Sequence, residues 1–184
     1  MPPLGLSSPT SVVADVDNDF DVSTTKNNNN NDELLLISKV SKELEIMKQQ
    51  KQLSSKFPYG CYELMLSLPG NNKCIDCGKP NPQWASISYG ILLCLNCSGC
   101  HRSLGVRYSK VRSITLDHWS PQQILHMLEG GNEQMTTFFQ RHSLFEEKKD
   151  KYKTKAARFY CNGLQQHCTK LISLPCYRGR NKHR

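Results

Sequence analysis

The sequence has no run of apolar residues long enough to span a bilayer, so we expect no transmembrane helix. Its N-terminus, MPPLGLSSPTSVVADVDNDF, has neither the basic start nor the continuous apolar stretch of a secretory signal. The nine cysteines are an odd number, so they do not form a complete set of disulfide pairs. No glycine-rich phosphate loop is visible, and we expect no nucleotide pocket. These absences predict a cytosolic or nuclear protein with reduced thiols, for which any membrane contact would be peripheral.

Positive charge is concentrated in the second half of the chain. The net charge is +8, and residues 102–184 carry sixteen Lys or Arg against six acidic residues, whereas residues 1–34 carry one Lys against six. A basic face suits nucleic acid, anionic lipid or an acidic protein surface, and charge alone does not choose among these partners. Four lysines are candidate contacts for an anionic membrane: Lys148, Lys149, Lys151 and Lys153.

The length of 184 residues suits one compact domain with flanking segments. Residues 1–33 bury too little apolar surface to offset the entropy of ordering, so they are predicted to be disordered. Residues 34–58 are predicted to form an amphipathic helical extension, with Ile37, Val40, Leu44 and Met47 on one face. This helix packs on the domain or pairs with a partner helix, and the packed arrangement is favoured. Residues 171–184 are read as a basic C-terminal tail.

Four further helices are predicted from apolar spacing and capping residues. In SPQQILHMLEGGN, Ser120 is the expected N-cap, Pro121 the first helical residue, and the glycines at 130 and 131 the end. The apolar positions of the other three are Cys61, Leu64, Met65 and Leu68, then Met135, Phe138 and Phe139, then Ala156, Phe159, Tyr160 and Leu164. The stretch WASISYGILLCLNC, residues 84–97, is rich in β-branched and aromatic residues and predicts short strands.

The cysteines contain a metal-site pattern. Cys74, Cys77, Cys94 and Cys97 form two C-x2-C knuckles separated by sixteen residues. Four thiolates complete the tetrahedral shell of one Zn²⁺ and leave no position for water, which predicts a structural site coupled to folding. Cys100 in a C-x5-C arrangement and His101 are the alternative ligands, but C-x2-C gives the tighter geometry. Cys100 is therefore predicted to be a small buried hydrophobe, and the other cysteines, Cys61, Cys161, Cys168 and Cys176, ordinary core or surface thiols.

Residues 61–170 resemble the zinc-finger domain of Arf GTPase-activating proteins. The motifs that carry the resemblance are C-x2-C-x16-C-x2-C followed by x4-R, NPQWAS between the knuckles, CSG-x-HRSLG and VRSITLDHW. The resemblance implies an α+β fold: a small four-cysteine zinc-finger core with a short three-stranded sheet surrounded by helices.

The resemblance also assigns roles to single residues. It implies that Arg102 is the catalytic arginine and that Trp84 supports the finger and its contact surface. Separately, Asp117 and Trp119 are expected to close the TLDHW segment structurally. Cys100 replaces the usual Ile or Val, and Arg107 replaces a His of the family pattern. From charge alone, a surface cation paired with Asp76 or Asp117 is the favoured interpretation of Arg102, and only the matching motif favours the catalytic role. Arg107, Lys110 and Arg112 are candidates for the same face or simply solvated charges.

The implied function is that of an enzyme regulator. The chain would accelerate GTP hydrolysis by a GTP-bound Arf-type small GTPase, acting in the cytoplasm and peripherally at the surface of Golgi or endosomal membranes. The alternatives are a GATA-like DNA-binding finger and a catalytically inactive interaction module. The sixteen-residue spacer and the CSG-x-HRSLG motif make nucleic acid the less favoured partner.

Overall fold

The computed structural model describes residues 22–49, 56–144 and 151–180, with side chains in the first helix from residue 31. The chain forms α1 (Val22–Gln49), α2 (Tyr59–Ser67), β1 (Trp84–Ser86), β2 (Ile91–Leu93), α3 (Leu95–Ser103), β3 (Val111–Ser113), α4 (Pro121–Glu129), α5 (Asn132–Arg141), the 3-10 turn η1 (Lys151–Lys153) and α6 (Lys155–Ile172). The three strands form one antiparallel sheet in the order β2-β1-β3. The α+β fold class is thus confirmed.

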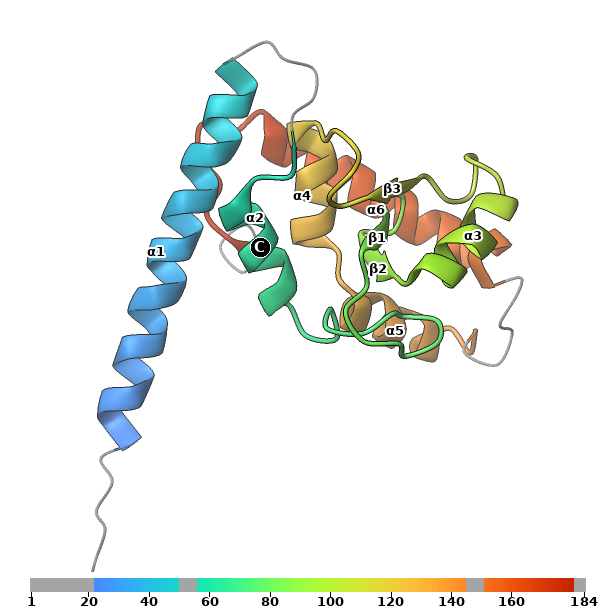
Figure 1. Cartoon of the computed structure of the whole chain (residues 1–184), viewed down its shortest axis with the longest axis horizontal. Helices are drawn as coiled ribbons and strands as arrows, with labels where there is room; N and C mark the ends of the chain where they lie inside the picture. The colour runs from blue at the N-terminus through green and yellow to red at the C-terminus, as the bar shows by residue number, and fades with distance from the viewer. Residues whose placement is uncertain (1–21, 50–55, 145–150, 181–184) are drawn as a thin grey trace, which may run out of the picture.

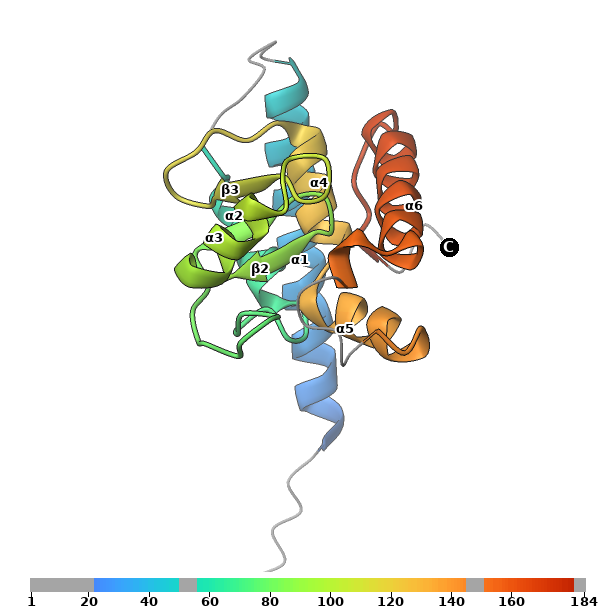
Figure 2. The same ribbon diagram turned by 90° about the vertical axis from the view of Figure 1, so that its right-hand side faces the viewer.

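Helices cover the sheet from several sides (Figure 1). α1 packs against α2 and α4, and α4 also packs against α6. Figure 2 shows α3 and α6 on opposite sides of the molecule, with the sheet and α4 between them. None of the helices within the described ranges is both long and apolar enough to cross a membrane.

The first helix begins earlier than predicted. α1 starts at Val22, so residues 22–33, which were expected to be disordered, are helical, while residues 1–21 lie outside the described ranges. Once a helix is nucleated, each further residue adds one hydrogen bond, which allows a polar segment to extend it. Val40, Leu44 and Met47 are buried against the domain. This agrees with the packed arrangement.

α1 also completes the start of α2. The N-cap of α2 is Pro58, which supplies no side-chain bond to the free amides of the first turn. Glu43 of α1 accepts those bonds instead, from Gly60 N at 3.0 Å and from Cys61 N at 2.9 Å. Glu43 thus ties α1 to the domain by accepting hydrogen bonds from backbone amides at the start of α2, which have no acceptor within that helix.

α4 follows the sequence prediction closely. Ser120 caps it, with its hydroxyl accepting from Gln123 N while the Gln123 side chain accepts from Ser120 N, and Pro121 is the first helical residue. The end of α4 meets the β1–β2 turn, where Gly90 has a φ of +64° and its carbonyl accepts from Gly131 N at 2.7 Å. A Cβ at residue 90 would lie 2.3 Å from the carbonyl oxygen of His126, so only glycine allows this approach.

α6 differs from the prediction in which face is buried. Its core residues are Ala157, Leu164, Cys168 and Leu171, whereas Phe159 is 73% exposed. The predicted stripe was therefore wrong at Phe159. A cysteine and an alanine occupy the buried positions, and their small size made the true face less obvious than the aromatic one.

The C-terminal segment is packed rather than a free tail as far as residue 180. Tyr177 is buried, and its hydroxyl donates to Glu129 Oε1 at 2.8 Å while its backbone N–H donates to Ser41 Oγ at 3.1 Å. Glu129 Oε2 also pairs with His167 Nε2 at 2.8 Å. One buried carboxylate at the end of α4 thus holds α6 and the segment after it.

In each outer strand, one outward backbone amide is bonded to a side chain. Leu92 N in β2 donates to Asn132 Oδ1 at 2.8 Å, and Asn132 Nδ2 donates to Lys73 O at 2.6 Å. Ser113 N in β3 donates to Asp117 Oδ2 at 2.7 Å. Trp119, which is fully buried, donates from Nε1 to Ser113 O at 3.1 Å. Asp117 and Trp119 therefore both bond the backbone of Ser113 and hold the TLDHW segment against β3.

Candidate functional site: a four-thiol centre beside Arg102

The two cysteine knuckles come together as predicted. The Sγ atoms of Cys74, Cys77, Cys94 and Cys97 all lie within 4.8 Å of one another. Four thiols in such a cluster fit a tetrahedral metal with Zn–S distances of about 2.3 Å. They are positioned to hold one metal ion.

Local structure explains why each knuckle points inward. In the first knuckle, Gly78 N donates to Cys74 O at 2.9 Å and Cys74 N donates to Lys79 O at 2.8 Å, which folds the chain into a tight turn. The second knuckle is the first turn of α3, where Cys94 is the N-cap and its Sγ accepts from Cys97 N at 3.5 Å. The stretch 84–97 is thus strand only at residues 84–86 and 91–93, and it ends in a helix.

The helix N-terminus favours the charged form of Cys94, the first thiol of the second knuckle. Partial burial alone would raise the pKa of the Cys94 thiol, but the Cys97 amide and the neighbouring thiols lower it to about 7. A thiol at the start of a helix is deprotonated more easily because the amides and the helix dipole stabilise a thiolate. Metal binding requires that deprotonated form.

Cys100 is not the buried residue that was predicted. It is exposed on α3 and stands outside the four-thiol cluster. Residue 100 lies about one helical turn beyond residue 97, roughly 4.5 Å further along the axis of α3, and its thiol is not among the four that cluster. The prediction that Cys97 belongs to the cluster agrees with this geometry.

His101 is buried beneath α3 and uses both ring nitrogens. Nε2 lies 3.0 Å from Asp76 Oδ2 in the first knuckle, and Nδ1 lies 2.7 Å from Ser109 Oγ. Ser109 Oγ is in turn 2.7 Å from Ser86 Oγ of β1. His101 therefore links α3 to the first knuckle, the sheet and the loop before β3.

Arg102, the next residue, faces solvent. Its Cζ lies 4.4 Å from the centroid of the Trp84 ring, a cation–π geometry. The pairing with Asp76 or Asp117 considered from charge alone is not what the structure contains, because Asp76 bonds His101 and Asp117 bonds Ser113 N. Trp84 in β1 therefore supports the guanidinium directly.

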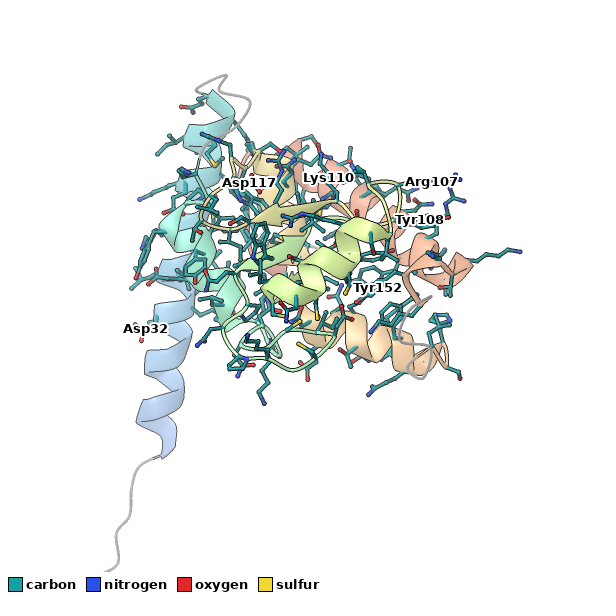
Figure 3. All side chains as sticks on the ribbon, turned by 45° about the vertical axis from the view of Figure 1, so that its right-hand side comes forward. Asp32, Arg107, Tyr108, Lys110, Asp117 and Tyr152 are labelled. Carbon is teal, nitrogen blue, oxygen red and sulfur yellow. The ribbon has the colours of Figure 1, made fainter. Side chains whose placement is uncertain are left out.

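The other basic candidates divide into two groups. Arg107 and Lys110 are exposed in the segment between α3 and β3, where Figure 3 shows them with Tyr108. Arg112 instead donates from Nη1 to His118 O at 2.9 Å, so its charge serves the loop after β3. Of the lysines assigned to a membrane, Lys148 and Lys149 lie outside the described residues. Lys151 is paired with Asp76 at 2.9 Å and cannot face a lipid surface freely.

A four-thiol cluster held between a knuckle turn and a helix start, beside a three-stranded sheet and surrounded by helices, defines a small zinc-finger domain. Residues 60–169 match the ArfGap family, described as "Putative GTPase activating protein for Arf". The chain belongs to this family.

Among the relatives, the chain is 53% identical over 74 residues to ADP-ribosylation factor GTPase-activating protein GCS1 of Saccharomyces cerevisiae, covering 40% of this chain and 21% of that protein. It is 46% identical over 101 residues to ADP-ribosylation factor GTPase-activating protein 3 of Mus musculus, covering 54% of this chain and 19% of that protein. The chain thus spans about a fifth of the length of these relatives. The crystal structure of a "putative GTPase activating protein for ADP ribosylation factor" from Cryptosporidium parvum is 34% identical, with a TM-score of 0.49, covering 61% of this chain and 89% of that one.

Two features of the site were not visible from the sequence. The helix α3 was missed because its only buried residues, Ser98 and His101, do not form an apolar stripe. The Asp76 cluster was missed because its members are far apart in the chain, with Tyr152 donating to Asp76 Oδ1 across 76 positions. The sequence carries no local signal for a bond of that length.

Proposed function

We propose that this chain is a GTPase-activating protein for Arf-type small GTPases and that it supplies Arg102 in trans to the bound GTP. The observation that carries the proposal is the placement of an exposed arginine, backed by Trp84, on the helix that begins with two of the four clustered cysteines. Membership of the ArfGap family supports it.

For GTP hydrolysis, the activator needs to supply little beyond that arginine. During GTP hydrolysis, negative charge develops on the transferring phosphoryl group, and an arginine supplied by a partner protein stabilises it, an effect of about 10³–10⁵ in rate. The GTPase itself holds the nucleotide, Mg²⁺ and the attacking water. Lysine is a poor replacement because it lacks the planar donor fork of the guanidinium.

The metal proposed for the four thiols is one structural Zn²⁺. Cys74, Cys77, Cys94 and Cys97 would fill its shell, so that it supports the fold and takes no part in the hydrolysis. Its contribution to activity is indirect. It would fix the start of α3, and therefore the base on which Arg102 stands, relative to the sheet that carries Trp84.

The surface around Arg102 is the proposed contact with the GTPase. Arg107 and Lys110 add positive charge close to it in sequence, which suits a partner that presents phosphate and acidic groups. The GTP-bound form is the expected partner, since only that form has the phosphoryl group to be transferred. An activator of this kind would act in the cytoplasm, at the surface of Golgi or endosomal membranes.

A DNA-binding role is less well supported. A groove-reading finger places several basic residues on its recognition helix. The sequence of α3, LNCSGCHRS, contains Arg102 as its single Lys or Arg. An inactive interaction module remains the alternative that only an assay separates.

The decisive experiment mixes the purified protein with a GTP-loaded Arf-type GTPase and follows phosphate release. We expect stimulation by the wild-type chain and stoichiometric zinc by atomic absorption. Normal zinc content without any stimulation would support the inactive interaction module instead. Salt-sensitive binding to duplex DNA together with no stimulation would favour the nucleic-acid alternative.

A further inference from the structure

The carboxylate of Asp76 collects three donors from two distant parts of the chain. Asp76 lies between the ligand cysteines of the first knuckle, and Oδ2 pairs with His101 Nε2 at 3.0 Å. Oδ1 accepts from Lys151 Nζ at 2.9 Å and from Tyr152 Oη at 2.8 Å. η1 is thereby connected, through one carboxylate, to the residue that directly precedes Arg102.

The side chains of the Asp76 cluster are largely shielded from water. The side chains of His101, Lys151 and Asp76 are 2%, 13% and 19% exposed. Lys151 Nζ also lies 5.1 Å from the centroid of the Tyr152 ring and 5.4 Å from that of Phe139. Charges that are shielded in this way interact more strongly than exposed ones and tolerate less displacement.

The cluster fixes the rotation of α3 about its own axis. The N-terminal end of this nine-residue helix carries Cys94 and Cys97, while at its other end the inward-facing side chain is that of His101. Successive helical residues point about 100° apart, so holding His101 inward sets the direction in which Arg102 leaves the helix. In the structure that direction brings Arg102 over the Trp84 ring.

We propose that Lys151 and Asp76 are positioning residues for Arg102, acting through His101. The inference rests on the proposed function, because it concerns how the arginine is presented to the GTPase. Lys151 of η1 fixes the position of the Asp76 carboxylate, and that carboxylate fixes the His101 ring. The His101 ring in turn sets the orientation of the last turn of α3. Neither Lys151 nor Asp76 is expected to touch the nucleotide.

The test compares Lys151→Met with Lys151→Arg and with a matched control. Lys39 makes an exposed pair with Glu63 at 3.1 Å on the α1–α2 side of the molecule, so Lys39→Met removes a lysine of the same kind elsewhere. In the GTPase assay we expect Lys151→Met to lower kcat by about 10- to 100-fold, since a displacement of about 1 Å can cost on the order of 10²-fold. KM for the GTPase should stay near wild type. Lys151→Arg should recover most of kcat, and Lys39→Met should lose none.

A second readout does not depend on activity. The indole N–H signal of Trp84 in a ¹H–¹⁵N spectrum reports the guanidinium stacked on its ring. We expect Lys151→Met to move this signal toward its position in Arg102→Ala, while Lys39→Met leaves it in place. If wild type fails to stimulate any GTPase, the proposed function is lost, and the indole signal still decides whether Lys151 controls the placement of Arg102.

The proposal is overturned by an unchanged kcat and indole signal in Lys151→Met, or by a loss that only follows lost zinc or a lowered Tm. If Lys151→Met does not fold, Tyr152→Phe replaces it, because this change removes a single hydroxyl bond to Asp76 and keeps the ring. The same shift of the Trp84 signal and a several-fold fall in kcat are then expected, and wild-type values in both would overturn the proposal.

Discussion

At the scale of single residues, the most specific prediction concerns Arg102. Replacing it with Lys or with Ala should remove most of the stimulation of GTP hydrolysis, by about 10³-fold or more, because neither replacement supplies the planar fork. Metal content and thermal unfolding should remain near wild type, since the side chain is exposed and stacks on the surface of the Trp84 ring. Phosphate release under single-turnover conditions measures the effect. Retention of activity in Arg102→Lys would remove the residue from the mechanism.

His126 makes a second prediction at this scale, on stability. Within the described part of the chain, neither of its ring nitrogens has a hydrogen-bond partner, and burial, together with the charge of Lys110, lowers its pKa from 6.5 to about 4. The unfolded chain therefore binds more protons than the folded one between these two values. The free energy of unfolding should fall as the pH drops through that window, by about 3 kcal/mol in all.

The measurement is denaturant unfolding of wild type and His126→Leu at a series of pH values. The difference between the two curves isolates this residue from the other groups that titrate in acid. His126→Leu should lose stability less steeply than wild type as the pH falls below about 6.5. Parallel curves would show that His126 does not cause the acid sensitivity.

At the scale of elements, the start of α3 decides the metal site. Cys97→Ser should lose the metal and unfold the domain, because the ligand set is coupled to folding. Cys100→Ser should keep one metal ion per chain and fold, since Cys100 is exposed and lies outside the cluster. Atomic absorption and far-UV circular dichroism on both variants make the comparison. The reverse result would make Cys100 the ligand.

The junction of α1 and α2 gives another prediction. Glu43→Ala leaves the amides of Gly60 and Cys61 without their acceptor, which should lower the free energy of unfolding by about 1–3 kcal/mol. Glu45→Ala is the matched control, because Glu45 is exposed on the same helix and accepts from Gln49 four residues away rather than from α2. Equal stability of the two variants in urea would mean that Glu43 does not cap α2.

The elements also show how far the sequence could be interpreted. α4 was predictable because Ser120, Pro121 and Gly130 are local signals, and the four-thiol cluster because the knuckle spacing is specific. α3 was not, since a short helix held by a metal site and a buried histidine needs no apolar stripe. The buried face of α6 and the Asp76 cluster depend on contacts that only the folded chain brings together.

At the scale of the whole molecule, the two sides seen in Figure 2 suggest two separate binding faces, one for the GTPase at α3 and one for an anionic membrane at α6. Arg102 lies on α3, while Lys155, Arg158 and Phe159 are exposed on the opposite helix α6. We expect the protein to bind anionic but not neutral vesicles and to be released by salt, which shortens the reach of surface charge to about 8 Å at physiological ionic strength.

Changing Lys155 and Arg158 to Glu should weaken vesicle binding in a sedimentation assay while stimulation of a soluble GTPase persists. The pair Lys39→Glu and Lys42→Glu on α1 changes the net charge by the same amount and serves as the control. If both pairs weaken binding equally, total charge rather than the α6 face governs the attraction. Loss of GTPase stimulation with the α6 pair would instead place that face at the GTPase.

The bonds made by Asn132 and Asp117 have a consequence for how this protein behaves in a crowded solution. An outer strand with free amides is a template on which another chain can build, and it seeds aggregation. Here the outward amide of Leu92 and that of Ser113 are each already occupied by a side chain from the same molecule. Each outer strand of the three-stranded sheet therefore offers fewer free amides to another chain, and the protein can present its basic surface to a partner with less strand-to-strand association.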